Sequence, residues 1–194
     1  MMPTIPDIGA YPKTILLRDG TQVVIRPLAS EDATRLLEFF QGIPEEERYY
    51  LKEDVTSPEV IQRWCYDIDF RRVVPIVALV GDEIVADATL HRSRAMARCH
   101  VGELRIVVAP AYREIGLGRR LIGELLDIAV ELGLSLASFE LVDRHENLAI
   151  SAAKSMGFQV AALLKERVRD VWGDPRGLVI MELPLEDYRL SYRF

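Results

Sequence analysis

A glycine-bearing loop at residues 113–118 has the composition of a site that binds a phosphate group. It follows an apolar stretch that ends in a proline, and it precedes a stretch in which leucines recur at helical spacing. Because Gly116 and Gly118 carry no Cβ atoms, successive N–H groups at the start of the helix can converge on an anion there. Further positive charge around this point comes from Arg113, Arg119 and Arg120. The sequence therefore predicts a phosphate or pyrophosphate site.

Three kinds of nucleotide-binding loop compete for this stretch, and the residues separate them. A Walker A loop needs a Gly-Lys-Ser/Thr triplet, and none follows Gly118. A dinucleotide-binding fingerprint needs a third glycine where this chain has Leu121. The third pattern, Arg/Gln-x-x-Gly-x-Gly/Ala between a strand and a helix, is matched by Arg113, Gly116 and Gly118. It resembles the coenzyme A loop of the GNAT N-acetyltransferase superfamily.

The resemblance extends over residues 14–185. The N-terminal segment from Asp19 to Asp32 is similar to the first strand and helix of many members, with bacterial protein-lysine acetyltransferase domains among the nearest. The pair Gly157-Phe158 is similar to the end of the family's fourth helix. The resemblance implies acetyl-CoA as the acyl donor. The pyrophosphate of acetyl-CoA would bind Arg113, Glu114, Ile115, Gly116, Leu117, Gly118 and Arg119. The resemblance also implies a pantetheine arm held by backbone groups of Ile106, Val107 and Val108 and reached by Asn147, which could alternatively cap its helix.

Glu103 is the predicted general base. Acyl transfer to an amine needs the neutral amine, whereas a lysine-type ammonium has a pKa of about 10.4 and is protonated at neutral pH. Glu103 interrupts an apolar strand shortly before the pantetheine positions, and related enzymes often place a glutamate there. We expect partial burial to raise the pKa of Glu103 toward the working range. The alternative is a structural ion pair with Arg105, which shares its face of the strand.

The group that protonates the leaving thiolate is not identified by the sequence. Many family members use a tyrosine in the fourth helix, at the position where this chain has Ala153. Ser151, Ser155 or water are the alternatives. The chain has three histidines, His91, His100 and His145, and each can titrate near neutrality. None of them belongs to a visible catalytic dyad. His145, which lies just before the Asn147 motif, is the one to test.

The cysteines indicate neither a disulfide framework nor a zinc site. Cys65 and Cys99 lie far apart and form no CxxC pair, so no metal is expected. No serine or cysteine nucleophile motif is present, which favours direct attack of the amine on the thioester over a covalent acyl-enzyme.

The elements that would position these residues are those of an α/β (α+β) fold. Strand-like runs occur at residues 21–26, 73–80, 83–90, 101–108, 134–142, 160–171 and 178–183. Helices are predicted to begin at the caps Ser30 and Ser57, and to span residues 117–132 and 147–156. We expect a mixed, mostly antiparallel sheet, splayed at the acyl-CoA site and flanked by about four helices.

Length and composition favour one globular domain. The chain has 194 residues, which we divide into an extended leader at 1–13, the acyltransferase domain at 14–185 and a C-terminal tail at 186–194. The tail carries Tyr188, Leu190, Tyr192 and Phe194, which pack either on their own domain or on a neighbour, and a homodimer is one expectation. A net charge of −6 opposes non-specific binding to nucleic acid and to anionic membranes. With no signal peptide or membrane-spanning run, we expect a cytoplasmic location.

The sequence thus predicts an N-acetyltransferase whose acceptor is a primary amine of a small molecule or of a protein lysine. The alternative is a sensor or regulatory subunit that binds acyl-CoA without turnover. Residues 41–72 are expected to line the acceptor pocket, and their acidic side chains would suit a cationic amine.

Overall fold

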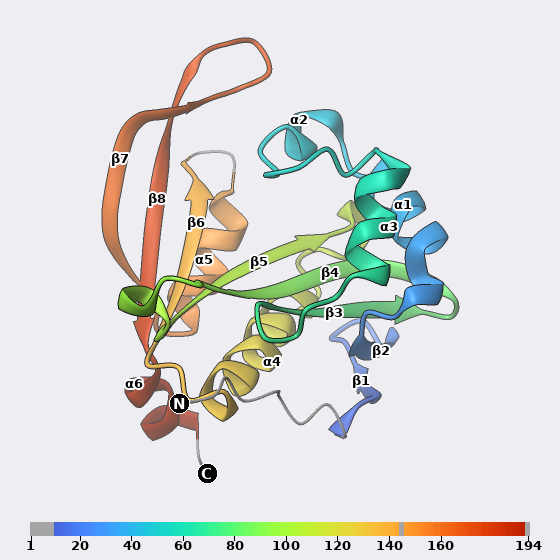
Figure 1. Ribbon diagram of the computed structural model, residues 1–194, viewed down its shortest axis with the longest axis horizontal. Coiled ribbons are helices and arrows are strands. Elements are labelled where there is room, and N and C mark those ends of the chain that lie inside the picture. The colour runs from blue at the N-terminus through green and yellow to red at the C-terminus, as the bar shows by residue number, and fades with distance from the viewer. Residues whose placement is uncertain (1–9, 144–145, 193–194) are drawn as a thin grey trace.

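Eight strands form one mixed sheet in the order β1-β2-β3-β4-β5-β6-β8-β7 (Figure 1). The computed structural model describes residues 10–143 and 146–192. The strands are β1 (Lys13–Leu16), β2 (Gln22–Pro27), β3 (Val73–Val80), β4 (Glu83–Arg92), β5 (Val101–Val108), β6 (Leu136–Val142), β7 (Gln159–Arg169) and β8 (Pro175–Pro184). Neighbouring strands are antiparallel except for β5 and β6, which are parallel. The predicted fold class is confirmed.

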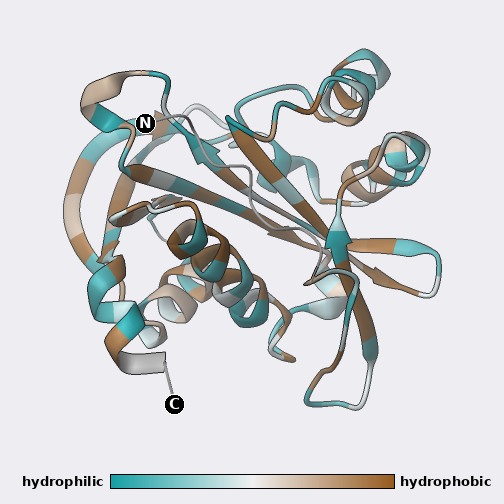
Figure 2. Cartoon of the chain, turned by 60° about the horizontal axis from the view of Figure 1, so that its bottom comes forward, coloured by the Kyte–Doolittle hydropathy of each residue, from teal (hydrophilic) through white to brown (hydrophobic). Residues whose placement is uncertain are grey.

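Helices cover both faces of this sheet. They are α1 (Ala33–Gln41), α2 (Glu45–Arg48), α3 (Pro58–Tyr66), α4 (Leu117–Glu131), α5 (Asn147–Ser155) and α6 (Leu185–Tyr192). In Figure 1, α4 lies beneath β3 to β5 and α1 and α3 lie on the other side. Figure 2 shows hydrophobic residues concentrated along the central strands, while the helices alternate hydrophobic and hydrophilic stretches. Among the described helices, none is both long and apolar enough to cross a membrane.

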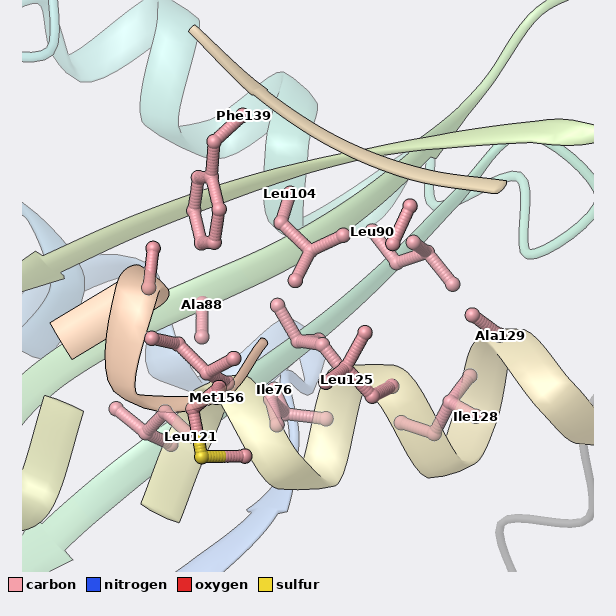
Figure 3. Packing of buried hydrophobic residues seen from close by; sticks show 14 of the residues in the cluster. Ile76, Ala88, Leu90, Leu104, Leu121, Leu125, Ile128, Ala129, Phe139 and Met156 are labelled. Carbon is pink, nitrogen blue, oxygen red and sulfur yellow. The ribbon is translucent and has the colours of Figure 1, made fainter. Parts of the chain in front are cut away.

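The long helix α4 is held on the sheet by the leucines whose spacing predicts it. Leu121 and Leu125 are fully buried, and Figure 3 shows them facing Ile76 and Leu90 of the strands. Each buried leucine contributes about 1.5–3 kcal/mol relative to an exposed one. Gly133 follows the helix with a φ of 72°, a left-handed conformation that suits glycine and ends the helix. The anion loop at the other end of α4 is therefore fixed to a rigid core.

The two predicted helix caps have different outcomes. Ser57 caps α3 as expected, because its Oγ accepts a hydrogen bond from the Val60 N–H at 3.4 Å and Pro58 is the first helical residue. Ser30 is wrong as the cap of the first helix: it lies in a 3₁₀ turn, and α1 begins at Ala33. The carboxylate of Asp32 closes that turn instead, accepting from the Ala29 N–H at 3.0 Å.

Two terminal elements of the fold are not predicted by the sequence. The short strand β1 extends the sheet beyond the first expected strand, and Lys13 ties it to Glu124 of α4 at 2.5 Å. The segment expected as a tail forms α6, whose Tyr188 is 8% exposed and donates to Asp127 at 2.9 Å. Tyr188 therefore packs on its own domain. With α2 and α6 the described residues hold six α-helices, more than the four expected.

Candidate active site

The sheet opens between β5 and β6, and this opening is the central feature of the site (Figure 1). The two strands are in register only from Val101 opposite Leu136 to Leu104 opposite Phe139. On the other side, β4 stays paired with β5 as far as Val108. The last residues of β5 therefore keep a partner on one side only.

The hydrogen-bond alternation of β5 decides which backbone groups face the opening. The Ala109 N–H donates to the Val85 carbonyl at 2.9 Å, so odd-numbered residues here bond to β4. The backbone groups of Ile106 and Val108 consequently point toward the opening, whereas those of Val107 face β4 opposite Asp87. Ile106 and Val108 thus offer a short row of backbone donors and acceptors to an extended ligand.

The predicted anion loop lies at the end of β5 and leads into α4. Positive φ angles at Glu114 (61°) and Gly116 (101°) bend the chain sharply between Tyr112 and the helix. Gly116 is the N-cap of α4 and no side chain caps the helix. The N–H groups of Leu117 and Gly118 in the first turn therefore lack intrahelical acceptors and can bind an anion.

Gly118 leaves space between the first turn of α4 and the end of β5. A Cβ atom on Gly118 would lie 4.0 Å from Cγ2 of Val108, its nearest neighbour, so a methyl group would fit without a clash. Larger side chains would fill the space over the strand end. At Gly116, a Cβ atom would meet only the Arg18 side chain, at 3.7 Å or more, but the positive φ disfavours any other residue.

The arginines near the loop differ in whether a carboxylate of the protein already binds them. The guanidinium of Arg113 is bound by both carboxylate oxygens of Glu47, at 2.9 and 2.5 Å, and also donates to the Val108 carbonyl at 2.9 Å. Arg120 pairs with Glu124 at 2.8 Å. Among the described residues, Arg18 and Arg119 have no carboxylate partner and remain able to meet a phosphate. Arg18 is a site residue that the sequence does not reveal, because it lies about a hundred residues before the loop.

Glu103 lies on the open face of β5 and is held by two cations. Its Oε1 accepts from Arg105 Nε at 2.8 Å and from Lys52 Nζ at 2.7 Å. Burial alone would raise the pKa of Glu103, but the hydrogen bonds from Arg105 and Lys52 outweigh it and keep the pKa below its ordinary value. The predicted rise of this pKa is therefore wrong. The alternative pairing with Arg105 is present, and Lys52 was not foreseen.

Comparisons with known proteins agree with this geometry. A profile of the acetyltransferase (GNAT) family matches residues 35–158, more than half of the chain. The chain belongs to the GNAT family. A curated relative, Acetyltransferase PA5475 of Pseudomonas aeruginosa, is 32% identical over 123 residues, which cover 58% of this chain and 62% of the relative. The chain therefore matches less than two thirds of that relative's length.

Solved GNAT structures share the fold. The structure of yncA from Salmonella typhimurium, determined with its cofactor acetyl-CoA, has a TM-score of 0.69 at 20% identity and covers 84% of this chain and 94% of that one. The GNAT domain of S. lividans PAT has a TM-score of 0.68 at 22% identity, with coverages of 88% and 96%. An N-acetyltransferase from Staphylococcus aureus Mu50 reaches 0.74 at 19% identity, with coverages of 84% and 98%.

Asn147, which resembles the family's pantetheine contact, is the first residue of α5. The N-cap of that helix is Glu146, so Asn147 does not occupy the capping position. The carboxyl of Glu146 has a raised pKa, because it is buried and lies near Glu47. It also accepts a hydrogen bond from the Val142 N–H. The sequence gives no signal for this carboxyl, because Glu47 lies about a hundred positions away along the chain.

The position of the expected tyrosine offers no room for one in this GNAT domain. Ala153 is fully buried against the core beneath α4. Ser151 is exposed, and the Ser155 hydroxyl donates to the Ala152 carbonyl at 2.7 Å.

Of the histidines, His91 behaves differently from the expectation. Burial, together with the nearby Arg105 charge, lowers the pKa of His91 to about 4, so it is neutral at physiological pH. Its Nε2 lies 2.9 Å from the Thr89 hydroxyl, and it lies opposite Glu103 in the register of β4 and β5. The expectation that His91 titrates near neutrality is wrong. His100 is exposed, and His145 lies outside the described residues.

Two residues of the segment predicted to line the acceptor pocket, Glu46 and Tyr50, line a pocket beside the end of β6. This pocket of about 180 Å³ lies between Tyr50, Asp143 and the turn that joins β7 to β8. The acidity of the segment is partly neutralised, since Glu47 pairs with Arg113 and Glu53 pairs with Arg63. The described residues contain no cluster of three or more side chains suited to a metal ion.

Proposed function

We propose that this GNAT protein transfers the acetyl group of acetyl-CoA to a primary amine by direct attack of the amine on the thioester. The observation that carries the proposal is the opening between β5 and β6, where backbone groups of Ile106 and Val108 lie next to the uncapped first turn of α4. An ordinary sheet would close this gap with strand pairing. An extended ligand that ends in a pyrophosphate fits both features.

In this proposal the pyrophosphate binds the loop from Arg113 to Gly118. The N–H groups at the start of α4 bind its oxygens, and Arg119 and Arg18 add charge from the rim. The guanidinium of Arg113 instead braces the loop by joining Glu47 to the Val108 carbonyl. The pantetheine arm lies along β5 and replaces the missing strand partner of the backbone amides of Ile106 and Val108.

Glu103 removes the proton that the amine loses. Its lowered pKa keeps it ionised at neutral pH, so it attracts a cationic acceptor. A lysine-type ammonium and an ordinary glutamate differ by about 6 pKa units, so transfer to Glu103 alone is uphill by roughly 8 kcal/mol. Desolvation of the amine in the opening reduces this cost, and the proton then passes to solvent.

The acceptor class is tested by a panel assay. Polyamines, amino acids, aminoglycosides and lysine peptides are each incubated with acetyl-CoA, and free thiol is measured. The proposal predicts amine-dependent thiol release for at least one class. Thiol release that stays at the hydrolysis background for all of them would contradict it.

A non-catalytic acyl-CoA sensor is the second candidate. Two observations favour it: Glu103 is already bound by Arg105 and Lys52, and Ala153 stands where a tyrosine is common. Calorimetry separates the two, because a sensor binds acetyl-CoA without amine-dependent turnover.

A further inference from the structure

A lysine of the chain itself occupies the place where an acceptor amine is expected. Lys52 lies between α2 and α3, and its Nζ lies 2.7 Å from Oε1 of Glu103 and 3.2 Å from Oε2 of Glu140. The side chain of Lys52 is 48% exposed. A primary amine therefore contacts the predicted base on the open face of the sheet.

The two carboxylates flank the point at which the sheet opens. Glu103 is on β5 opposite Ser138 of β6, and Glu140 is two residues beyond Ser138, so both carboxylates share one face. Since a strand advances about 3.3 Å per residue, Glu103 lies roughly 10 Å of strand before Ile106. The flexible four-carbon stem of Lys52 lets its amine move along this face toward the opening.

We propose that Lys52 is an acetylation site of this protein, modified in cis from acetyl-CoA bound in its own opening. This inference rests on the proposed function, because it uses the same donor site and the same base. Lys13 lacks this placement, because it pairs with Glu124 of α4 at 2.5 Å, away from the Glu103 face. Lys13 is therefore an internal control, an ion-paired lysine without access to the thioester.

The reaction needs no reagent beyond acetyl-CoA. The Lys52 ammonium loses a proton through Glu103 to solvent, and its nitrogen lone pair forms a bond to the thioester carbonyl carbon. The nitrogen then loses its second proton, the carbon–sulfur bond breaks, and the sulfur leaves with its electron pair and takes up a proton as the free coenzyme A thiol. The product carries an amide at Lys52 and no positive charge there.

Acetylation would change the environment of Glu103. Lys52 is one of the two cations that hold down the pKa of this carboxyl, and an acetylated lysine can no longer form an ion pair with it or with Glu140. The carboxylates would then be free to receive an external cationic amine. The modification would thus open the acceptor site.

The experiment follows acetylation of the full-length protein with acetyl-CoA by intact mass and peptide mapping. We expect Lys52 to be acetylated well before Lys13, at a rate per molecule that does not depend on protein concentration. Lys52→Arg, which keeps a cation between the two carboxylates, should abolish the early mass increase, and Glu103→Gln should slow it by ~10²-fold.

Four results would overturn the inference. Equal rates at Lys52 and Lys13 would indicate non-specific chemistry. A rate per molecule that rises in proportion to protein concentration would indicate reaction between molecules. An amine of the panel acetylated while Lys52 stays unmodified would overturn this inference and leave the proposed function intact. Acetylation of neither Lys52 nor any amine would contradict both.

Discussion

Replacing Gly118 tests the placement of the donor pyrophosphate without disturbing the fold. Gly118 is the second residue of α4, and a methyl group there would lie 4.0 Å from Val108, an ordinary contact. Alanine favours a helix over glycine by about 1 kcal/mol, so Gly118→Ala should be at least as stable as the wild type. The same methyl group would project into the space over the end of β5, where the anion is placed.

The expected loss of affinity follows from the hydrogen bonds at the helix start. A hydrogen bond to a charged group contributes about 1.5–3 kcal/mol, so losing one weakens acetyl-CoA binding by roughly 10- to 150-fold. A tryptophan at this position should displace the anion from both first-turn amides and weaken binding by ~10²–10⁴-fold.

Isothermal calorimetry with acetyl-CoA measures this directly. Gly123→Ala is the matched control, since Gly123 lies further along α4 and its Cβ atom would also have its nearest neighbour, Met156, at 4.0 Å. Both alanine variants should gain similar stability, but only the change at Gly118 should weaken binding. Wild-type affinity in Gly118→Trp would refute the placement of the pyrophosphate.

Three further predictions follow from other parts of the structure. Arg119→Gln should weaken acetyl-CoA binding about 2- to 5-fold at low salt. Arg120→Gln removes a group already paired with Glu124 and should have less effect in the same titration. Equal losses in the two variants would contradict the assignment of Arg119 to the phosphate. Leu125→Ala should lower the free energy of unfolding by about 2–5 kcal/mol in urea, while Leu190→Ala, at a side chain 72% exposed, should stay within about 0.5 kcal/mol. Burial would raise the pKa of Asp32, but hydrogen bonds from Arg26 and Ala29 hold it below its ordinary value. Its contribution to stability is therefore present above its unfolded pKa of about 3.9 and lost as the pH falls below it, so the urea midpoints of wild type and Asp32→Asn should converge in acid; a constant difference would be inconsistent with the ion pair.

Local sequence patterns predict the parts of this fold that local physics determines. The leucine spacing of α4, the Ser57 cap and the apolar run of β5 each reflect interactions within a few residues or burial on one face. The anion loop is predictable for the same reason, because its glycines and the following helix are adjacent in sequence. Helix α2 and strand β1 are too short for a periodic pattern to reveal them.

Contacts between distant residues explain most of what the sequence leaves out. Lys52 meets Glu103 across 51 positions, and Arg113 meets Glu47 across 66. The first contact adds to the hydrogen bond from Arg105, and the two together outweigh burial and keep the Glu103 pKa below its ordinary value, against the expected direction. The second engages the Arg113 guanidinium with Glu47, whereas the sequence assigns Arg113 to the pyrophosphate. Side-chain roles at a site of this kind therefore depend on the tertiary arrangement.

The central claim is that acetyl-CoA binding and acetyl transfer use different residues, with Glu103 serving the transfer. The most direct measurement compares wild type and Glu103→Gln in two assays, amine-dependent thiol release and calorimetric binding of acetyl-CoA. Glu53→Gln, which alters a carboxylate paired with Arg63, is the control. We predict that Glu103→Gln loses ~10²-fold or more in turnover with unchanged binding. Unchanged turnover in Glu103→Gln would contradict the account.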